Sequence, residues 1–173
     1  MNKYDVWSNL AIDKLNDEFC TGAFRPQNES DVQCHLYHAL FETRSQVKGI
    51  THNHVILTEV PFSVSGEKFD VAIVRQKKEG FETRLIIEIK ETSKGHLTSS
   101  EVEERIKPDV EKLRNYGKWL ETERKIMMRN YKKPIVFFFF RGAGRHGIAV
   151  KTEREMKKLQ EKYNDVVLRW GPG

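Results

Sequence analysis

The run PIVFFFF at residues 134–140 is the most apolar stretch of the chain, and it limits the choice of fold more than any other segment. A strand with one solvent-exposed face alternates apolar and polar residues, whereas this run leaves no face for water. We therefore expect 134–140 to be a central strand of a sheet that is covered on both sides.

Helical and extended patterns alternate along the rest of the chain. Apolar residues at intervals of three and four predict helices over 3–20, 28–48, 100–126 and 151–163. Short apolar runs bounded by turn residues predict further strands over 54–62, 68–74, 84–91 and 165–170. The order ααβββαβαβ indicates an α/β protein, and we expect a three-layer α/β/α sandwich with a mixed central sheet.

Several local signals refine these elements. Asn28 is a good N-cap for the second helix, and Ser100 with Glu103 fits a capping box for the third. Pro108 predicts a kink or short break inside the third helix. A short connection through Ser65 and Gly66 makes the first two strands an antiparallel hairpin.

Composition sets the broad class of protein. A length of 173 residues fits one domain, and a net charge of +5 with a pI of about 9.1 favours a polyanionic partner. The two cysteines have no metal-ligand spacing, which fits a reducing compartment. With no signal-like apolar segment and no run near the ~20 residues of a membrane helix, we expect a cytoplasmic protein without a membrane partner.

The strand LIIEIKE, residues 85–91, carries charges where a buried strand should be apolar. Glu88 and Lys90 alternate with Ile87 and Ile89, so both project from one face, about 6–7 Å apart. Burying isolated charges costs several kcal/mol unless something compensates them. The pair therefore predicts a site that faces a cation and a substrate.

A second acidic residue lies inside the preceding apolar strand. Asp70 is flanked by Phe69 and Val71 and shares a face with Ala72. Neighbouring strands lie about 4.8 Å apart, so Asp70 can approach Glu88 if the two strands pair. Two close carboxylates repel unless a proton or a cation joins them. A divalent cation with oxygen ligands, Mg²⁺ with Mn²⁺ as the alternative, satisfies both groups.

These residues resemble the motif of the PD-(D/E)xK nuclease superfamily, which has the restriction-endonuclease-like fold. The motif reads Phe69-Asp70, then, eighteen residues after Asp70, Glu88-Ile89-Lys90, with Phe69 in place of the usual proline. The resemblance covers about 28–140 as a catalytic core. Residues 1–27 then form an N-terminal helical extension and 141–173 a C-terminal helix and strand of the same domain.

The resemblance implies roles for these residues. Asp70, Glu88 and the main-chain carbonyl of Ile89 would hold the metal. Lys90 would position or deprotonate the attacking water and offset charge on the phosphate. Families in this group often carry another acid on the first core helix, and Glu29 is the candidate because it shares the stripe of the buried residues; a favourable position at the helix N-terminus is its structural alternative. Glu59, which alternates with Val55 and Leu57 on its strand, competes for that role as an inward-pointing metal ligand.

Further residues are weaker candidates for nucleic-acid contacts. Lys112 and Tyr116 resemble a Gln-x-x-x-Tyr motif of exonuclease-like members, with Lys in place of Gln; the preferred reading is a solvated Lys112 and a core Tyr116. GAGRHG at 142–147 fits a dinucleotide-binding signature, but too few residues follow it for that domain. Arg141 and Arg145 in this loop could instead contact a phosphodiester backbone, or lie in a solvated loop.

Two other patterns are more simply explained by solvated helix faces. Spacings of four, three and four place four metal-ligating side chains on one helical stripe, but one helix rarely encloses an ion; they are Asp31, His35, His38 and Glu42. Basic segments at 125–133 and 151–158 are ordinarily solvated, and the first, with Tyr131, could follow a nucleic-acid strand.

The leading hypothesis is a metal-dependent nuclease that hydrolyses phosphodiester bonds, with DNA as substrate and internal cleavage favoured. Small members of the superfamily commonly act as homodimers, so a homodimer is expected by analogy. The alternatives are a non-catalytic nucleic-acid-binding or assembly module on the same fold, and a nuclease directed at RNA.

Overall fold

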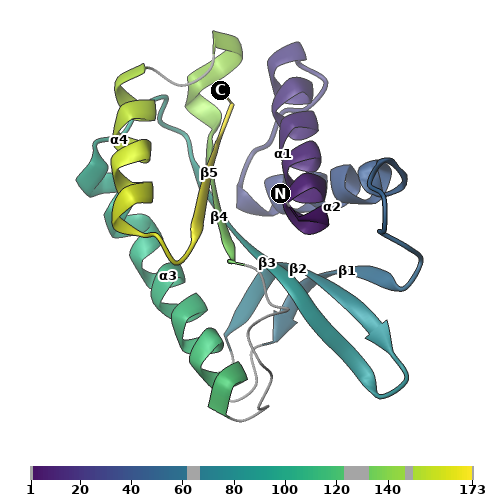
Figure 1. Cartoon of the computed structure of the whole chain (residues 1–173). Helices are drawn as coiled ribbons and strands as arrows, with labels where there is room; N and C mark the ends of the chain where they lie inside the picture. The colour runs from purple at the N-terminus through teal and green to yellow at the C-terminus, as the bar shows by residue number, and fades with distance from the viewer. Residues whose placement is uncertain (1, 62–66, 123–132, 147–149, 173) are drawn as a thin grey trace.

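The structure is a computed structural model that describes residues 2–61, 67–122, 133–146 and 150–172 (Figure 1). It is an α/β structure with a five-stranded mixed sheet and four α-helices. Its elements are α1 (Lys3–Thr21), α2 (Glu29–Thr43), β1 (His54–Pro61), β2 (Lys68–Lys77), β3 (Gly80–Thr92), α3 (Ser99–Thr122), β4 (Ile135–Phe140), α4 (Val150–Lys162), β5 (Val167–Gly171) and two short 3₁₀ helices, η1 (Arg44–Gln46) and η3 (Arg141–His146).

The order of helices and strands is the one predicted from the sequence, and the mixed sheet is confirmed. The strands lie in the order β1-β2-β3-β4-β5. β1, β2 and β3 are antiparallel neighbours, which confirms the predicted pairing of the first two strands, whereas β4 and β5 join in parallel. The predicted turn at Ser65 and Gly66 lies outside the described residues. A parallel β3–β4 pair requires a crossover connection, and α3 lies within it.

The residues of β4 divide between two hydrophobic cores, as a strand covered on both sides requires. Phe137 and Phe139 belong to the first core, together with residues of α1 and α2. Phe138 and Phe140 belong to the second core, together with residues of α3 and α4. All six residues of β4 are buried, which confirms the expectation from the apolar run, and Figure 1 shows the two pairs of helices on opposite sides of β4.

The start of α2 places its first residue beside β3, the middle strand of the sheet. The Asn28 side chain accepts a hydrogen bond from the Asp31 N–H, so the predicted N-cap is confirmed. Glu29 is the first residue of the helix. Val32 and Leu36, on the same stripe, are fully buried in the first core.

The capping box of α3 lies two residues earlier in the chain than predicted. The capping box is formed by Thr98 and Glu101: the Thr98 hydroxyl accepts from the Glu101 N–H, and the Glu101 carboxylate accepts from the Thr98 N–H. Glu103, predicted for that role, instead accepts hydrogen bonds from Lys162 and Tyr163. The helix continues through Pro108 without a break.

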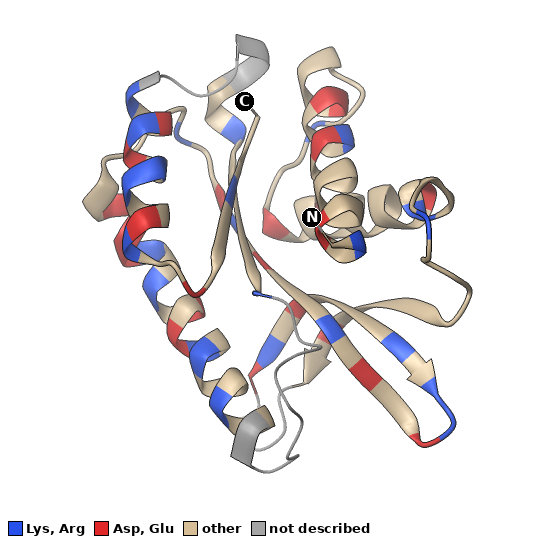
Figure 2. Ribbon diagram, in the orientation of Figure 1, with Lys and Arg blue, Asp and Glu red and all other residues tan. Residues whose placement is uncertain are grey.

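Basic and acidic residues are interspersed along α3 and α4 (Figure 2). On α4, Lys157 pairs with Glu153 and Lys158 with Glu155, so the basic segment 151–158 forms a solvated helix face. Most of the segment 125–133 lies outside the described residues. None of the helices in the described part of the chain is long and apolar enough to cross a membrane.

Gly142, at the start of the GAGRHG motif, lies directly against the loop that follows β3. A Cβ atom added to Gly142 would lie 2.0 Å from the Ser93 carbonyl oxygen and 2.7 Å from the Gly95 nitrogen. Both are backbone atoms that cannot rotate away. This glycine is therefore required for the close approach of two backbone segments.

Replacement of Gly142 with alanine should destabilise the protein by about 1–3 kcal/mol, the usual range for overpacking. The measurement is the free energy of unfolding from urea denaturation. Glu79→Ala, at an exposed turn position, is the control and should change it by less than about 0.5 kcal/mol. Equal stability of the two variants would contradict the close approach.

Candidate functional site

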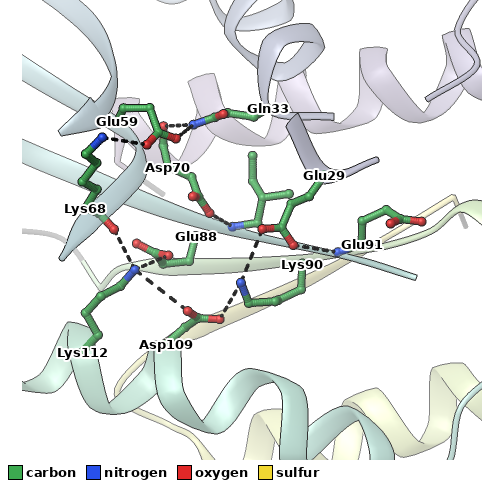
Figure 3. Close-up of polar contacts among 11 residues, drawn as sticks. Glu29, Gln33, Glu59, Lys68, Asp70, Glu88, Lys90, Glu91, Asp109 and Lys112 are labelled. Atoms are coloured by element: carbon green, nitrogen blue, oxygen red, sulfur yellow. Dashed lines mark hydrogen bonds and ion pairs between the residues drawn. The ribbon is translucent and has the colours of Figure 1, made fainter. Parts of the chain in front are cut away.

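The two strand acids, Asp70 and Glu88, lie opposite each other on the paired strands β2 and β3. Val71 of β2 pairs with Ile87 of β3 in antiparallel register. Asp70 precedes Val71 and Glu88 follows Ile87, which places the two carboxylates at the same level of neighbouring strands (Figure 3). The structure therefore brings together Asp70 and Glu88 as the sequence predicted.

Asp70 reaches across to the backbone of β3. Its Oδ2 atom accepts a hydrogen bond of 2.6 Å from the Ile89 N–H. Burial raises the pKa of Asp70, while this hydrogen bond and the Lys90 ammonium oppose the rise. The Ile89 side chain fills the first core, so only the backbone of this residue faces the site.

Glu88 is the most deeply buried charged residue of the site, with 1% of its surface exposed. Its Oε2 atom accepts a hydrogen bond of 2.7 Å from Lys112 Nζ. Its Oε1 atom is buried and has no hydrogen-bond partner among the described residues. Burial raises the pKa of Glu88 to about 8; Asp70 adds to the rise, and Lys112 opposes it.

Lys90 lies between α2 and α3. Its Nζ atom is 3.3 Å from Asp109 Oδ2 and 3.6 Å from Glu29 Oε1. Burial lowers the pKa of Lys90, but the two carboxylates outweigh it and the net shift is upward. The side chain is therefore held as an ammonium ion, which fits the offsetting of negative charge better than the removal of a proton from water.

Asp109 belongs to the site but was not identified from the sequence. It is buried, and Lys90 and Lys112 oppose the rise in its pKa that burial causes. The spacing of residues along α3 could have identified it. Asp109 belongs to a buried stripe with spacings of four, three, four, three and four, which consists of Val102, Ile106, Asp109, Leu113, Tyr116 and Leu120. An acid on such a stripe must face a compensating partner.

Glu29 reaches the site from the N-terminus of α2. Besides its approach to Lys90, its Oε2 atom accepts a hydrogen bond of 3.3 Å from the Glu91 N–H. Burial raises its pKa, and Lys90 opposes the rise. Glu29 therefore lies beside Lys90, although 43% of its side chain remains exposed, and its role as the additional acid stays a prediction.

Glu59 does not point inward, so that prediction was wrong. Its side chain is 54% exposed and contacts Gln33 and Lys68 (Figure 3). The cause is a backbone φ of +51°, which interrupts the alternation of β1 at this residue. Gln33 also donates to the Asp70 carbonyl oxygen, so Glu59 belongs to a neighbouring polar contact rather than to the buried cluster.

Lys112 was predicted to be solvated, but it is largely buried. Tyr116 lies in the second core, as predicted. The Lys112 ammonium donates to Glu88 and to the Lys68 carbonyl oxygen, and its side chain is 13% exposed. The Tyr116 ring packs on Phe69, and its hydroxyl donates to Thr83 Oγ1 at 3.0 Å. The spacing of four thus places Lys112 in the site and Tyr116 beside it.

The remaining candidates pair with other groups or lie outside the described residues. Arg141 Nε donates to Glu91 Oε1 at 2.8 Å, and the side chain of Arg145 lies outside the described residues. On the α2 stripe, His35 pairs with Glu18 at 2.6 Å and Asp31 accepts from the Gln27 N–H. These side chains turn to separate partners, and no cluster of three or more His, Cys, Asp or Glu suited to a metal occurs among the described residues.

The site as a whole carries excess negative charge. If every group is ionised, its carboxylates outnumber its ammonium groups by two; they are Glu29, Asp70, Glu88 and Asp109 against Lys90 and Lys112. A protonated Glu88 relieves part of the excess, and a divalent cation would neutralise it completely. The arrangement can therefore bind a cation between Asp70 and Glu88 and present the Lys90 ammonium beside it.

Comparison of the chain with models of protein families, with curated proteins and with solved structures finds no match.

The raised pKa of Glu88 predicts how stability depends on pH in the metal-free protein. Between its ordinary pKa of 4.5 and about 8, the folded state binds one more proton at Glu88 than the unfolded state does. The contribution of Glu88 to the free energy of unfolding should therefore fall as pH rises through this window, by up to about 1.4 kcal/mol per pH unit.

This contribution is measured as the difference in unfolding free energy between wild type and Glu88→Gln, in EDTA, from pH 5.5 to 9. Glutamine keeps the shape of a protonated Glu88 and does not titrate. The difference should decline up to about pH 8 and then level off. A difference independent of pH would show that Glu88 is ionised in the folded protein throughout.

Proposed function

We propose that this protein is a metal-dependent nuclease that hydrolyses phosphodiester bonds. The observation that carries the proposal is the Glu88 carboxylate, which is buried beside Asp70 and has one oxygen without a hydrogen-bond partner in the part of the chain that the structure describes. A buried carboxylate oxygen without a partner destabilises the folded protein, and a divalent cation would be a suitable partner for it.

The arrangement of the chain supports the same proposal. Antiparallel β1-β2-β3 followed by parallel β4 and β5, with α1 and α2 in one core and α3 and α4 in the other, is consistent with a three-layer α/β/α sandwich. We infer that this is the restriction-endonuclease-like fold, with Asp70, Glu88 and Lys90 in the positions of the PD-(D/E)xK motif.

The residues present fit a Mg²⁺ or Mn²⁺ ion. Asp70 and Glu88 would hold it with carboxylate oxygens, and the Ile89 carbonyl would add a third oxygen. When bound, the ion would polarise the phosphodiester and lower the pKa of a nearby water molecule. Glu59 has no part in this set because its side chain is directed to Gln33 and Lys68.

Lys90 supplies the positive charge of the chain itself. Its ammonium is held between Asp109 and Glu29, on the same face of β3 as Glu88. An ammonium fixed in a largely buried site stabilises negative charge that develops on a phosphate more strongly than one in water does. Asp109 and Glu29 act on the reaction through the position of Lys90.

The substrate proposed is DNA, cleaved internally, with RNA as the alternative. The net charge of +5 favours a polyanion but does not distinguish the two. A homodimer, in which two sites meet two strands, is proposed by analogy with small members of the superfamily.

A second candidate function is a nucleic-acid-binding module that does not cut. It is favoured by the ion pairs of Lys112 with Glu88 and of Lys90 with Asp109, since these compensate buried acids without a metal. Such a module should bind nucleic acid equally well in EDTA and leave it intact.

The nuclease proposal predicts Mg²⁺- or Mn²⁺-dependent cleavage that EDTA abolishes. Lys90→Ala should lower the rate by about 100- to 1,000-fold, because it removes a fixed charge next to the reacting phosphate. Asp70→Asn and Glu88→Gln should abolish metal-dependent cleavage. The measurement uses supercoiled, linear, branched and single-stranded DNA and RNA.

Lys107→Ala is the control, because Lys107 is an exposed lysine on α3 and should not affect the rate. If wild type and Lys90→Ala leave every substrate equally intact, the nuclease proposal fails. Binding of nucleic acid without cleavage, unaffected by EDTA, would then support the second candidate.

A further inference from the structure

Lys112 occupies one oxygen of the carboxylate to which the proposed function assigns a metal. Its Nζ atom donates to Glu88 Oε2 at 2.7 Å, and both side chains are largely shielded from water. The lysine comes from α3 and the glutamate from β3, so the contact joins two elements across the second core. Figure 3 shows the ammonium directed at the carboxylate.

This ion pair leaves Glu88 only partly satisfied. Glu88 Oε1 remains buried without a hydrogen-bond partner from any described residue, and Asp70 still repels the carboxylate. An ammonium is a single charge, whereas the cluster carries two negative charges in excess when it is ionised. Lys112 therefore neutralises Glu88 less completely than a divalent cation would.

Lys112 also has other groups to contact if Glu88 takes another partner. Its Nζ atom donates to the Lys68 carbonyl oxygen at 2.8 Å and lies 3.9 Å from Asp109 Oδ1. It also lies 5.4 Å from the centre of the Phe69 ring, within the range of a cation–π interaction. Loss of the Glu88 contact would leave the ammonium among these groups rather than unpaired.

We infer that Lys112 is the counter-ion of Glu88 when this carboxylate is ionised in the metal-free protein, and that a divalent cation competes with Lys112 for it. Lys112 would then set how tightly the site binds the ion. This inference rests on the proposed function, since it requires that Asp70 and Glu88 bind an ion. Its physical basis is that the entering ion must weaken the Lys112–Glu88 attraction and is repelled by the ammonium.

The test is calorimetric titration of the full chain with Mg²⁺, and with Ca²⁺ as a second probe, at pH 9, above the Glu88 pKa of about 8, so that the carboxylate is ionised. Lys112→Gln removes the competing charge and should bind the ion at least about tenfold more tightly than wild type, a change of about 1.4 kcal/mol. Lys112→Arg keeps a cation and should bind like wild type. Lys107→Gln removes an exposed charge from the same helix and is the control.

Thermal unfolding gives a second measurement that does not depend on activity. Without metal, Lys112→Gln should be less stable than wild type, because Glu88 loses its counter-ion. Mg²⁺ should then raise the Tm of Lys112→Gln more than that of wild type, since tighter binding stabilises the folded state more. If this variant is unfolded in EDTA, Mg²⁺ should restore its helical circular dichroism.

The outcomes separate this inference from the proposed function. If wild type binds the ion and Lys112→Gln binds it equally or more weakly, the competition is disproved and the metal site stands. If Lys107→Gln tightens binding as much as Lys112→Gln, the effect is one of net charge and the inference is overturned. If neither wild type nor Lys112→Gln binds an ion, both the inference and the metal-dependent function fail.

Discussion

The Glu88 carboxylate is buried between the sheet and α3, and the rest of the site depends on how its negative charge is compensated. Transfer of a carboxylate out of water costs several kcal/mol unless partners replace the lost hydration. Here α3 supplies Lys112 to one oxygen, whereas β2 brings Asp70 to the same level of the sheet and so adds a second negative charge. The second oxygen has no partner in the described protein, and a cation bound there would complete the arrangement.

The topology of the chain explains why these groups meet. β3 is antiparallel to β2 and parallel to β4, so the chain must cross over between β3 and β4. The crossover contains α3, which packs in the second core on the face from which Glu88 projects. Asp109 and Lys112, three residues apart on that helix, therefore face the strand acids. The connection between β3 and β4 thus also supplies two residues of the site.

The sequence was sufficient for most of the fold and for four of the six charged residues of the site. Period-two alternation placed Glu88 and Lys90 on one face, because regular strands follow this rule. It failed at Glu59, where a positive φ reverses the side chain, a feature that alternation cannot reveal. On α3, Lys112 was expected in solvent and Asp109 was missed. The spacing of apolar residues alone defines a predicted buried face, and it passes over the charged residues that share this face. The pairing of helix with strand depends on tertiary packing that no local pattern specifies.

The central claim is that Asp70 and Glu88 share a divalent cation. Anomalous diffraction from crystals soaked in Mn²⁺ tests it most directly, because it locates the ion without reference to activity. We expect a strong anomalous peak at coordination distance from both carboxylates. Well-ordered Asp70 and Glu88 side chains with no peak between them, and Lys112 still bound to Glu88, would contradict it.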